Sequence, residues 1–170
     1  MKKPSVKKLA LCGVLTAFAL IAFMLENLLP PLFLPGARLG LSNIFILICA
    51  YLCGGIYGFC ALIIKCVAGS IFSGNFSAII YSLPSGVASL SLQLVLTLVI
   101  KQVSIVCSSI AGATVNITIQ NLIFCLISGA SEYLCYLPYL ALLGVLSGLI
   151  VGFIVYLAIK KLPITRLMIN

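Results

Sequence analysis

The sequence predicts an all-α integral membrane protein: a bundle of six transmembrane helices with both termini in the cytoplasm. Three observations predict this class: 64% of the 170 residues are hydrophobic, only 7% are charged, and the mean hydropathy is +1.35. A helix that crosses a bilayer needs about 20 mostly apolar residues, so this chain has room for about six crossings with short connections. We therefore treat residues 1–170 as one membrane domain without a soluble part.

Proline, glycine and short polar stretches separate the apolar segments. Pro30 and Pro31 end the first segment, because proline lacks the backbone donor that a helix needs. Gly54, Gly55 and Gly58 interrupt the second and lead directly into the third, and a turn containing Gly74 follows. The expected spans are about 9–29, 39–57, 58–72, 78–100, 103–127 and 136–159.

The basic residues predict the orientation of the bundle. The net charge is +8, and most lysines lie near the two ends of the chain. Basic residues beside a span favour the cytoplasmic side, so six spans place both ends there. Glu26, Arg38, Asn75 and Glu132 then face outward. The aromatic residues are dispersed through the apolar segments, which argues against nucleic-acid binding.

The residue types that most enzymes use are scarce in this chain. It has two acidic residues, both glutamates, and no histidine. It contains no phosphate-binding loop, no Ser-His-Asp set and no carboxylate cluster for magnesium. The eight cysteines lie mostly in apolar runs, where cysteine behaves as a small hydrophobe. We expect no catalytic residues, no metal and no cofactor.

A few polar residues at membrane depth are the candidates for ligand binding, because burying them is costly without a partner. Lys65 either reaches the interface through its long stem or meets an anion or an internal carboxylate, for which Glu26 is the candidate. Asn116 and Gln120 lie one helical turn apart and either bind a polar ligand or bond to neighbouring helices. Gln93 presents the same choice, and there we favour a structural role.

Arg38 lies in a segment rich in proline and glycine, just before the second span. Its guanidinium can clamp a phosphate or carboxylate at an outer vestibule, or it can act only as an interface anchor. Asn43 follows in the same segment. The predicted substrate-binding residues are Glu26, Arg38, Asn43, Lys65, Asn116 and Gln120.

Small residues recur at four-residue spacing, which allows helices to approach closely in a membrane. The two sets are Ala50, Gly54 and Gly58, and Gly144, Gly148 and Gly152. Packing inside the bundle is the favoured interpretation, and a docking face for another membrane protein is the alternative. Gly13 and Ala17 in the first span present a weaker version of the same choice.

Several motifs resemble a bacterial membrane family that carries two names, heptaprenyl diphosphate synthase component I and Gx transporter. The resemblance covers nearly the whole chain and is most specific at Leu39-Gly40-Leu41-Ser42-Asn43. Further matching segments are Leu25-Glu26, Leu83-Pro84-Ser85-Gly86, Gly112-Ala113 with Gln120, and Tyr136-Leu137-Pro138. Lys65 stands where the family pattern has an arginine, and Asn116 stands where it has a histidine.

This family is similar in size and span pattern to the substrate-binding S components of energy-coupling factor transporters. That similarity implies a ligand site near the outer face, a transmembrane coupling subunit that binds the small residues Gly13 and Ala17 of the first span, and separate ATPases. The leading hypothesis is a transporter subunit in a bacterial plasma membrane that binds an anionic, isoprenoid or vitamin-like molecule. One alternative is an accessory subunit for polyprenyl diphosphate or quinone synthesis or for flavin-linked extracellular redox assembly. Another is a packing scaffold without a ligand.

Overall fold

The computed structural model describes residues 6–28, 40–74, 76–100, 103–129 and 131–161. Within these ranges the chain is helical and contains no strand. Six α-helices follow one another, and a short 3-10 helix, η1, precedes the last of them. Their bounds are α1 Val6–Leu28, α2 Ser42–Cys53, α3 Gly55–Phe72, α4 Ser77–Val99, α5 Ile105–Ser128, η1 Ser131–Tyr136 and α6 Leu137–Lys161.

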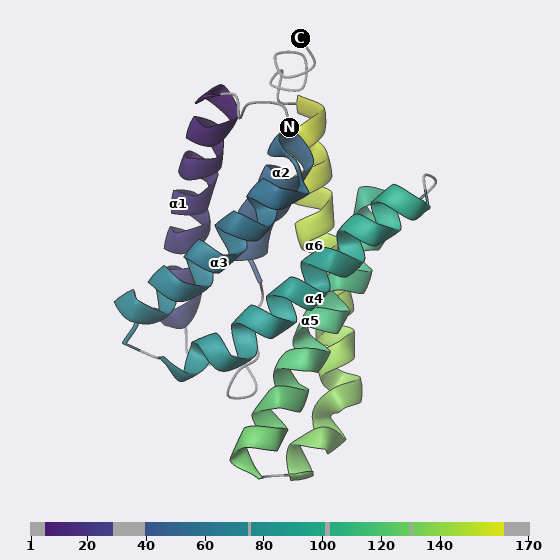
Figure 1. Ribbon diagram of the computed structural model, residues 1–170. Coiled ribbons are helices and arrows are strands. Elements are labelled where there is room, and N and C mark those ends of the chain that lie inside the picture. Colours follow the sequence, from purple (N-terminus) through teal and green to yellow (C-terminus); the bar gives the residue numbers. More distant parts are fainter. Residues whose placement is uncertain (1–5, 29–39, 75, 101–102, 130, 162–170) are drawn as a thin grey trace.

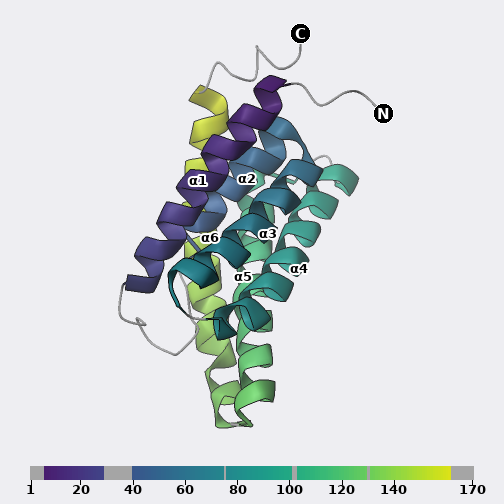
Figure 2. The same cartoon turned by 60° about the vertical axis from the view of Figure 1, so that its left-hand side comes forward.

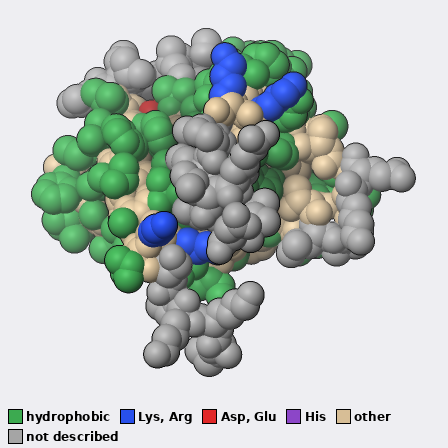
Figure 3. Space-filling view, turned by 90° about the horizontal axis from the view of Figure 1, so that it is seen from above, with side chains coloured by type: hydrophobic (Ala, Val, Ile, Leu, Met, Phe, Trp, Pro, Cys, Tyr) green, Lys and Arg blue, Asp and Glu red, His purple; other side chains and the backbone are tan. Residues whose placement is uncertain are grey.

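The helices run alternately up and down, so α1 begins and α6 ends on the same side of the bundle (Figures 1 and 2). Lys7 and Lys8 lie at the start of α1, and Lys160 and Lys161 lie in the last turn of α6. Lysine side chains are visible on this face when it is seen from above (Figure 3). The arrangement fits an even number of spans. That this face is cytoplasmic stays a prediction from the lysines.

Five of the described helices are long and apolar enough to cross a membrane, and α2 is not. We expected a second span over about 39–57, but α2 has only 12 residues. At 1.5 Å per residue such a helix is about 18 Å long, well short of a hydrocarbon core of about 30 Å. Gly54 causes the early end, because its φ of 118° and ψ of 157° lie outside the helical region. The third helix therefore begins at Gly55 rather than at Gly58.

Local signals explain where α5 begins and ends. The Ser104 hydroxyl accepts a hydrogen bond from the Cys107 backbone N–H at 3.2 Å, which caps the first turn. Gly129, with a φ of 67°, takes the left-handed conformation that commonly ends a helix. The hairpin of α5 and α6 extends beyond the other helices at the end opposite the lysines (Figures 1 and 2).

The glycines of α6 pack inside the bundle, as the favoured interpretation predicted. A Cβ atom on Gly148 would lie 2.6 Å from the Ile110 Cα of α5, and one on Gly144 would lie 2.8 Å from the Thr114 Cα. Gly58 likewise leaves room for Ala50 of the preceding helix, at 2.6 Å. These spacings bring helix backbones together within the chain, so they need no external partner.

Candidate functional site

The site is built around the start of α2. Gly40 adopts a φ of 74°, which turns the chain into the helix. The backbone N–H of Leu41 donates to the Glu26 carboxylate at the end of α1. The backbone N–H of Asn43 donates to the Gly40 carbonyl at 2.9 Å. Glu26 therefore links the end of α1 to the start of α2, and a carboxylate is favourable there because of the partial positive charge at a helix N-terminus.

Lys65 of α3 points into the bundle and does not reach the interface. Only 6% of the residue is exposed. Its Nζ donates to the Asn43 Oδ1 at 3.0 Å and lies 5.2 Å from the centre of the Phe23 ring. An ammonium group at that distance from an aromatic face gains a favourable cation–π interaction. The structure therefore buries this lysine among its neighbours in the bundle, which favours the internal environment of the two that the sequence left open.

The first cavity, which we call the Lys65 cavity, lies among α1 to α5. Its volume is about 20 Å³, room for roughly one water molecule. It carries both signs of charge, from Lys65 and Glu26, beside amide and hydroxyl groups. The lining residues are Phe23, Glu26, Gly40, Ser42, Asn43, Leu62, Lys65, Ser82, Gly86, Asn116 and Gln120.

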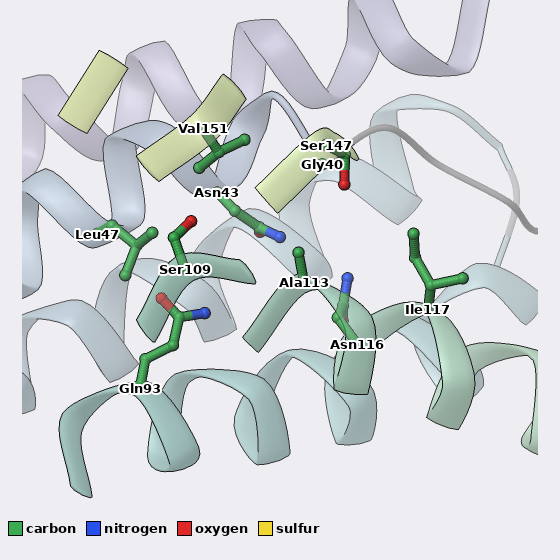
Figure 4. A pocket seen from close by; sticks show the side chains of 10 residues that line it. All are labelled: Gly40, Asn43, Leu47, Gln93, Ser109, Ala113, Asn116, Ile117, Ser147 and Val151. Carbon is green, nitrogen blue, oxygen red and sulfur yellow. The ribbon is translucent and has the colours of Figure 1, made fainter. Parts of the chain in front are cut away.

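The second cavity, which we call the Gln93 cavity, adjoins the first and has a volume of about 10 Å³. The two cavities share Gly40, Asn43 and Asn116 as wall residues. None of the described residues that line the second one is charged. The polar ends of Asn43, Gln93, Ser109 and Asn116 turn toward the space between the helices (Figure 4). The lining residues are Gly40, Asn43, Leu47, Gln93, Ser109, Ala113, Asn116, Ile117, Ser147 and Val151.

The polar atoms that lack a hydrogen-bond partner gather at these two cavities. Within the described part of the chain, four buried side-chain oxygen atoms have no partner: the Ser42 Oγ, Gln93 Oε1, Ser109 Oγ and Gln120 Oε1. The first and last line the Lys65 cavity, and the other two line the Gln93 cavity. Leaving a buried polar group unpaired costs about 1–3 kcal/mol. Their concentration at one place therefore marks the centre of the bundle as a site for a polar occupant.

Five of the six residues that the sequence singled out line the Lys65 cavity: Glu26, Asn43, Lys65, Asn116 and Gln120. The sixth, Arg38, lies outside the described residues. Asn121, beside Gln120, instead joins α5 to η1, since its Nδ2 donates to the Tyr133 carbonyl at 3.2 Å.

Sequence reasoning missed the serines of the two cavities, Ser42, Ser82, Ser109 and Ser147, and it assigned Gln93 a structural role. The Gln93 Nε2 donates to the Ser89 hydroxyl at 3.0 Å, as a structural role requires, while the Gln93 Oε1 has no partner within the described residues. Serines are common on packed membrane helices, so only the proximity of Ser42 to Asn43 offered a signal.

Gly13 and Ala17, predicted to bind a partner, are both exposed on the outer face of α1. A Cβ atom on Gly13 would meet nothing within 4 Å. This position differs from the glycines of α6, which α5 covers. The structure thus leaves this part of α1 open toward the membrane.

The described residues contain no group of three or more His, Cys, Asp or Glu side chains that can hold a metal ion. The cysteines are free thiols, five of them buried. The polar groups that line the two central cavities are one ammonium, one carboxylate, several amides and several hydroxyls.

Comparison with protein-family models matches residues 15–157 to the family described as heptaprenyl diphosphate synthase component I. No curated protein and no solved structure gives a significant match. The matched region includes α2 to α5 completely and most of α1 and α6, and with them every residue that lines the two cavities. The chain belongs to the heptaprenyl diphosphate synthase component I family.

Proposed function

We propose that this protein is a non-catalytic, substrate-binding membrane subunit of a small-molecule transporter in a bacterial plasma membrane. The observation that carries the proposal is the pair of adjoining cavities in which six helices present polar side chains. A membrane bundle that served only for packing would gain nothing from burying an ammonium group and four unpartnered oxygen atoms at its centre. A ligand that pairs with the four oxygen atoms would repay their desolvation.

The charged residues support a ligand with an anionic group. The Lys65 ammonium lines its cavity and donates to the Asn43 Oδ1 at 3.0 Å. Glu26 holds the start of α2 in place through Leu41. A negatively charged substituent near Lys65 would be stabilised by this ammonium in surroundings of low dielectric.

Each cavity has room for about one water molecule, so a larger ligand requires the helices to move apart. Such a change fits a transporter subunit that alternates between states. The exposed small residues Gly13 and Ala17 on α1 give a coupling subunit close access to the helix backbone, and separate ATPases would supply the energy.

The test is to purify the full chain from its host in mild detergent and to identify co-purifying small molecules by native mass spectrometry. We expect a bound compound in the wild type. Its occupancy should fall at least about tenfold in Lys65→Met, because one charge-assisted hydrogen bond contributes about 1.5–3 kcal/mol.

Lys160→Met is the matched control, since Lys160 lies exposed at the end of α6, 5.7 Å from the Tyr156 ring. Occupancy should stay at the wild-type level in this variant. Equal occupancy in the wild type and in Lys65→Met would remove the Lys65 cavity as the binding site.

The family match favours a second candidate function, an accessory subunit of prenyl diphosphate synthesis. In that case a soluble synthase should co-purify with the chain, and the Lys65→Met change should leave that association intact. Recovery of only membrane coupling subunits and ATPases would argue against this second function. Recovery of a soluble synthase without coupling subunits and ATPases would argue against the transporter function.

A further inference from the structure

The hydrogen bonds around the Gln93 cavity define the orientation of two amide side chains. The Ser89 hydroxyl donates to the Gly112 carbonyl at 2.7 Å, because a carbonyl oxygen can only accept. With its single hydrogen committed, the Ser89 oxygen can only accept from Gln93, whose Nε2 lies at 3.0 Å. A reversed amide would place two acceptors against each other. The Gln93 Oε1 therefore points away from Ser89 and has no partner within the described chain, and the Gln93 side chain lines the cavity.

The same reasoning orients Asn43 in the opposite sense. The Lys65 ammonium can only donate, so the Asn43 oxygen faces it at 3.0 Å. The Asn43 amide nitrogen, a donor, then points away from Lys65 and into the Gln93 cavity (Figure 4). The hydrogen bonds thus orient one acceptor, the Gln93 Oε1, and one donor, the Asn43 Nδ2, at the Gln93 cavity. Both atoms belong to uncharged side chains.

Two glycines leave the room that these amide side chains occupy. A Cβ atom on Gly112 would lie 1.9 Å from the Gln93 Nε2, so only glycine leaves room for that side chain. A Cβ atom on Gly40 would lie 3.2 Å from the Asn43 Nδ2, where it would crowd the donor. The backbone therefore accommodates the orientation that the hydrogen bonds require.

We propose that the Gln93 cavity, once the helices have moved apart to admit a ligand larger than one water molecule, binds an uncharged amide-type group, a lactam or ureido N–H beside a C=O, of a nitrogen heterocycle. The N–H donates to the Gln93 Oε1, and the C=O accepts from the Asn43 Nδ2. An anionic group fits this cavity poorly, because it offers only acceptors to the oriented Gln93 oxygen. This inference rests on the proposed function, and it adds the chemical class of the part of the ligand that enters the Gln93 cavity.

The experiment uses three probes that carry this edge on rings of increasing size: 2-imidazolidinone, uracil and lumazine. Each is paired with its fully N-methylated counterpart, which keeps the C=O and loses the N–H. Binding to the purified full chain is measured by native mass spectrometry and by thermal shift. We expect at least one N–H probe to bind, and its methylated counterpart to bind about tenfold to a hundredfold more weakly.

The variant Gln93→Met should weaken binding of the N–H probe by the same factor. Ser91→Ala is the matched control on α4, because the Ser91 hydroxyl donates to the Val87 carbonyl of its own helix and Ser91 is not among the described residues that line either cavity. Thermal unfolding of both variants without a probe shows whether each remains folded.

Three results would overturn the inference: no N–H probe binds, the methylated forms bind equally well, or Gln93→Met binds as the wild type does. Each would mean that a buried water alone pairs with these groups. A co-purified compound that is lost in Lys65→Met and retained in Gln93→Met would also overturn it, while leaving the proposed function in place. Failure of both the probes and co-purification would remove both proposals.

Discussion

The pair of helices α5 and α6 and the centre of the bundle around the start of α2 are packed in opposite ways. Along the pair, Gly144, Gly148 and Gly152 bring α6 so close that a Cβ atom on each would lie 2.6–2.9 Å from a Cα atom of α5. At the centre, two cavities and four unpartnered oxygen atoms lie among polar side chains. One region is closely packed, and the other leaves polar groups unsatisfied.

The difference shows how stability and binding are divided in this membrane protein. Lipid offers helices no hydrophobic reason to associate, so close contact between small residues supplies the attraction. Polar atoms without partners work against stability. The close α5–α6 contact can hold the bundle together while the centre remains available for a ligand. Three predictions test this division.

The prediction with the largest expected effect concerns which side of the membrane each end of the bundle faces. Cys135 is exposed in η1 at the tip of the α5–α6 hairpin, and Cys107 is exposed in the first turn of α5 at the other end. If the lysines are cytoplasmic, a membrane-impermeant maleimide applied to intact cells should label Cys135 and leave Cys107 unlabelled. Labelling should therefore disappear in Cys135→Ser and persist in Cys107→Ser. The reverse pattern would invert the topology and place the start of α2 toward the cytoplasm.

The next effect concerns the close helix contact. Gly148→Ala should lower the free energy of unfolding by about 2 kcal/mol, because the added methyl group would meet the α5 backbone rather than a flexible side chain. Gly13→Ala is the matched control and should leave stability unchanged or raise it by up to about 1 kcal/mol through higher helix propensity. Thermal unfolding in detergent measures both. Equal losses in the two variants would mean that the α5–α6 contact is not the stabilising one.

The smallest effect concerns the polar centre. Without a ligand, Gln93→Met should change the free energy of unfolding by less than about 1 kcal/mol, since it removes both an unpaired oxygen and the bond to Ser89. Met has a similar volume and fills the same space. Chemical unfolding of the ligand-free protein measures this. A loss as large as that of Gly148→Ala would show that Gln93 mainly holds α4 against α5.

The sequence predicted much of this arrangement, for identifiable reasons. Long apolar runs locate membrane helices well, because the bilayer requires them. Polar residues inside such runs are few, so Glu26, Lys65, Asn116 and Gln120 stood out. The length of α2 was predicted wrongly, since hydropathy continues through Gly54 and only the backbone angles at that residue end the helix.

By itself, the sequence determined the class of the protein, the order of its apolar segments and the small set of polar residues at membrane depth. The tertiary structure alone decided which of these residues meet. Glu26, Asn43, Lys65 and Asn116 come from four different helices, and their proximity depends on how the helices pack. It also decided how the Asn43 and Gln93 amides are oriented, because that depends on partners from other parts of the chain.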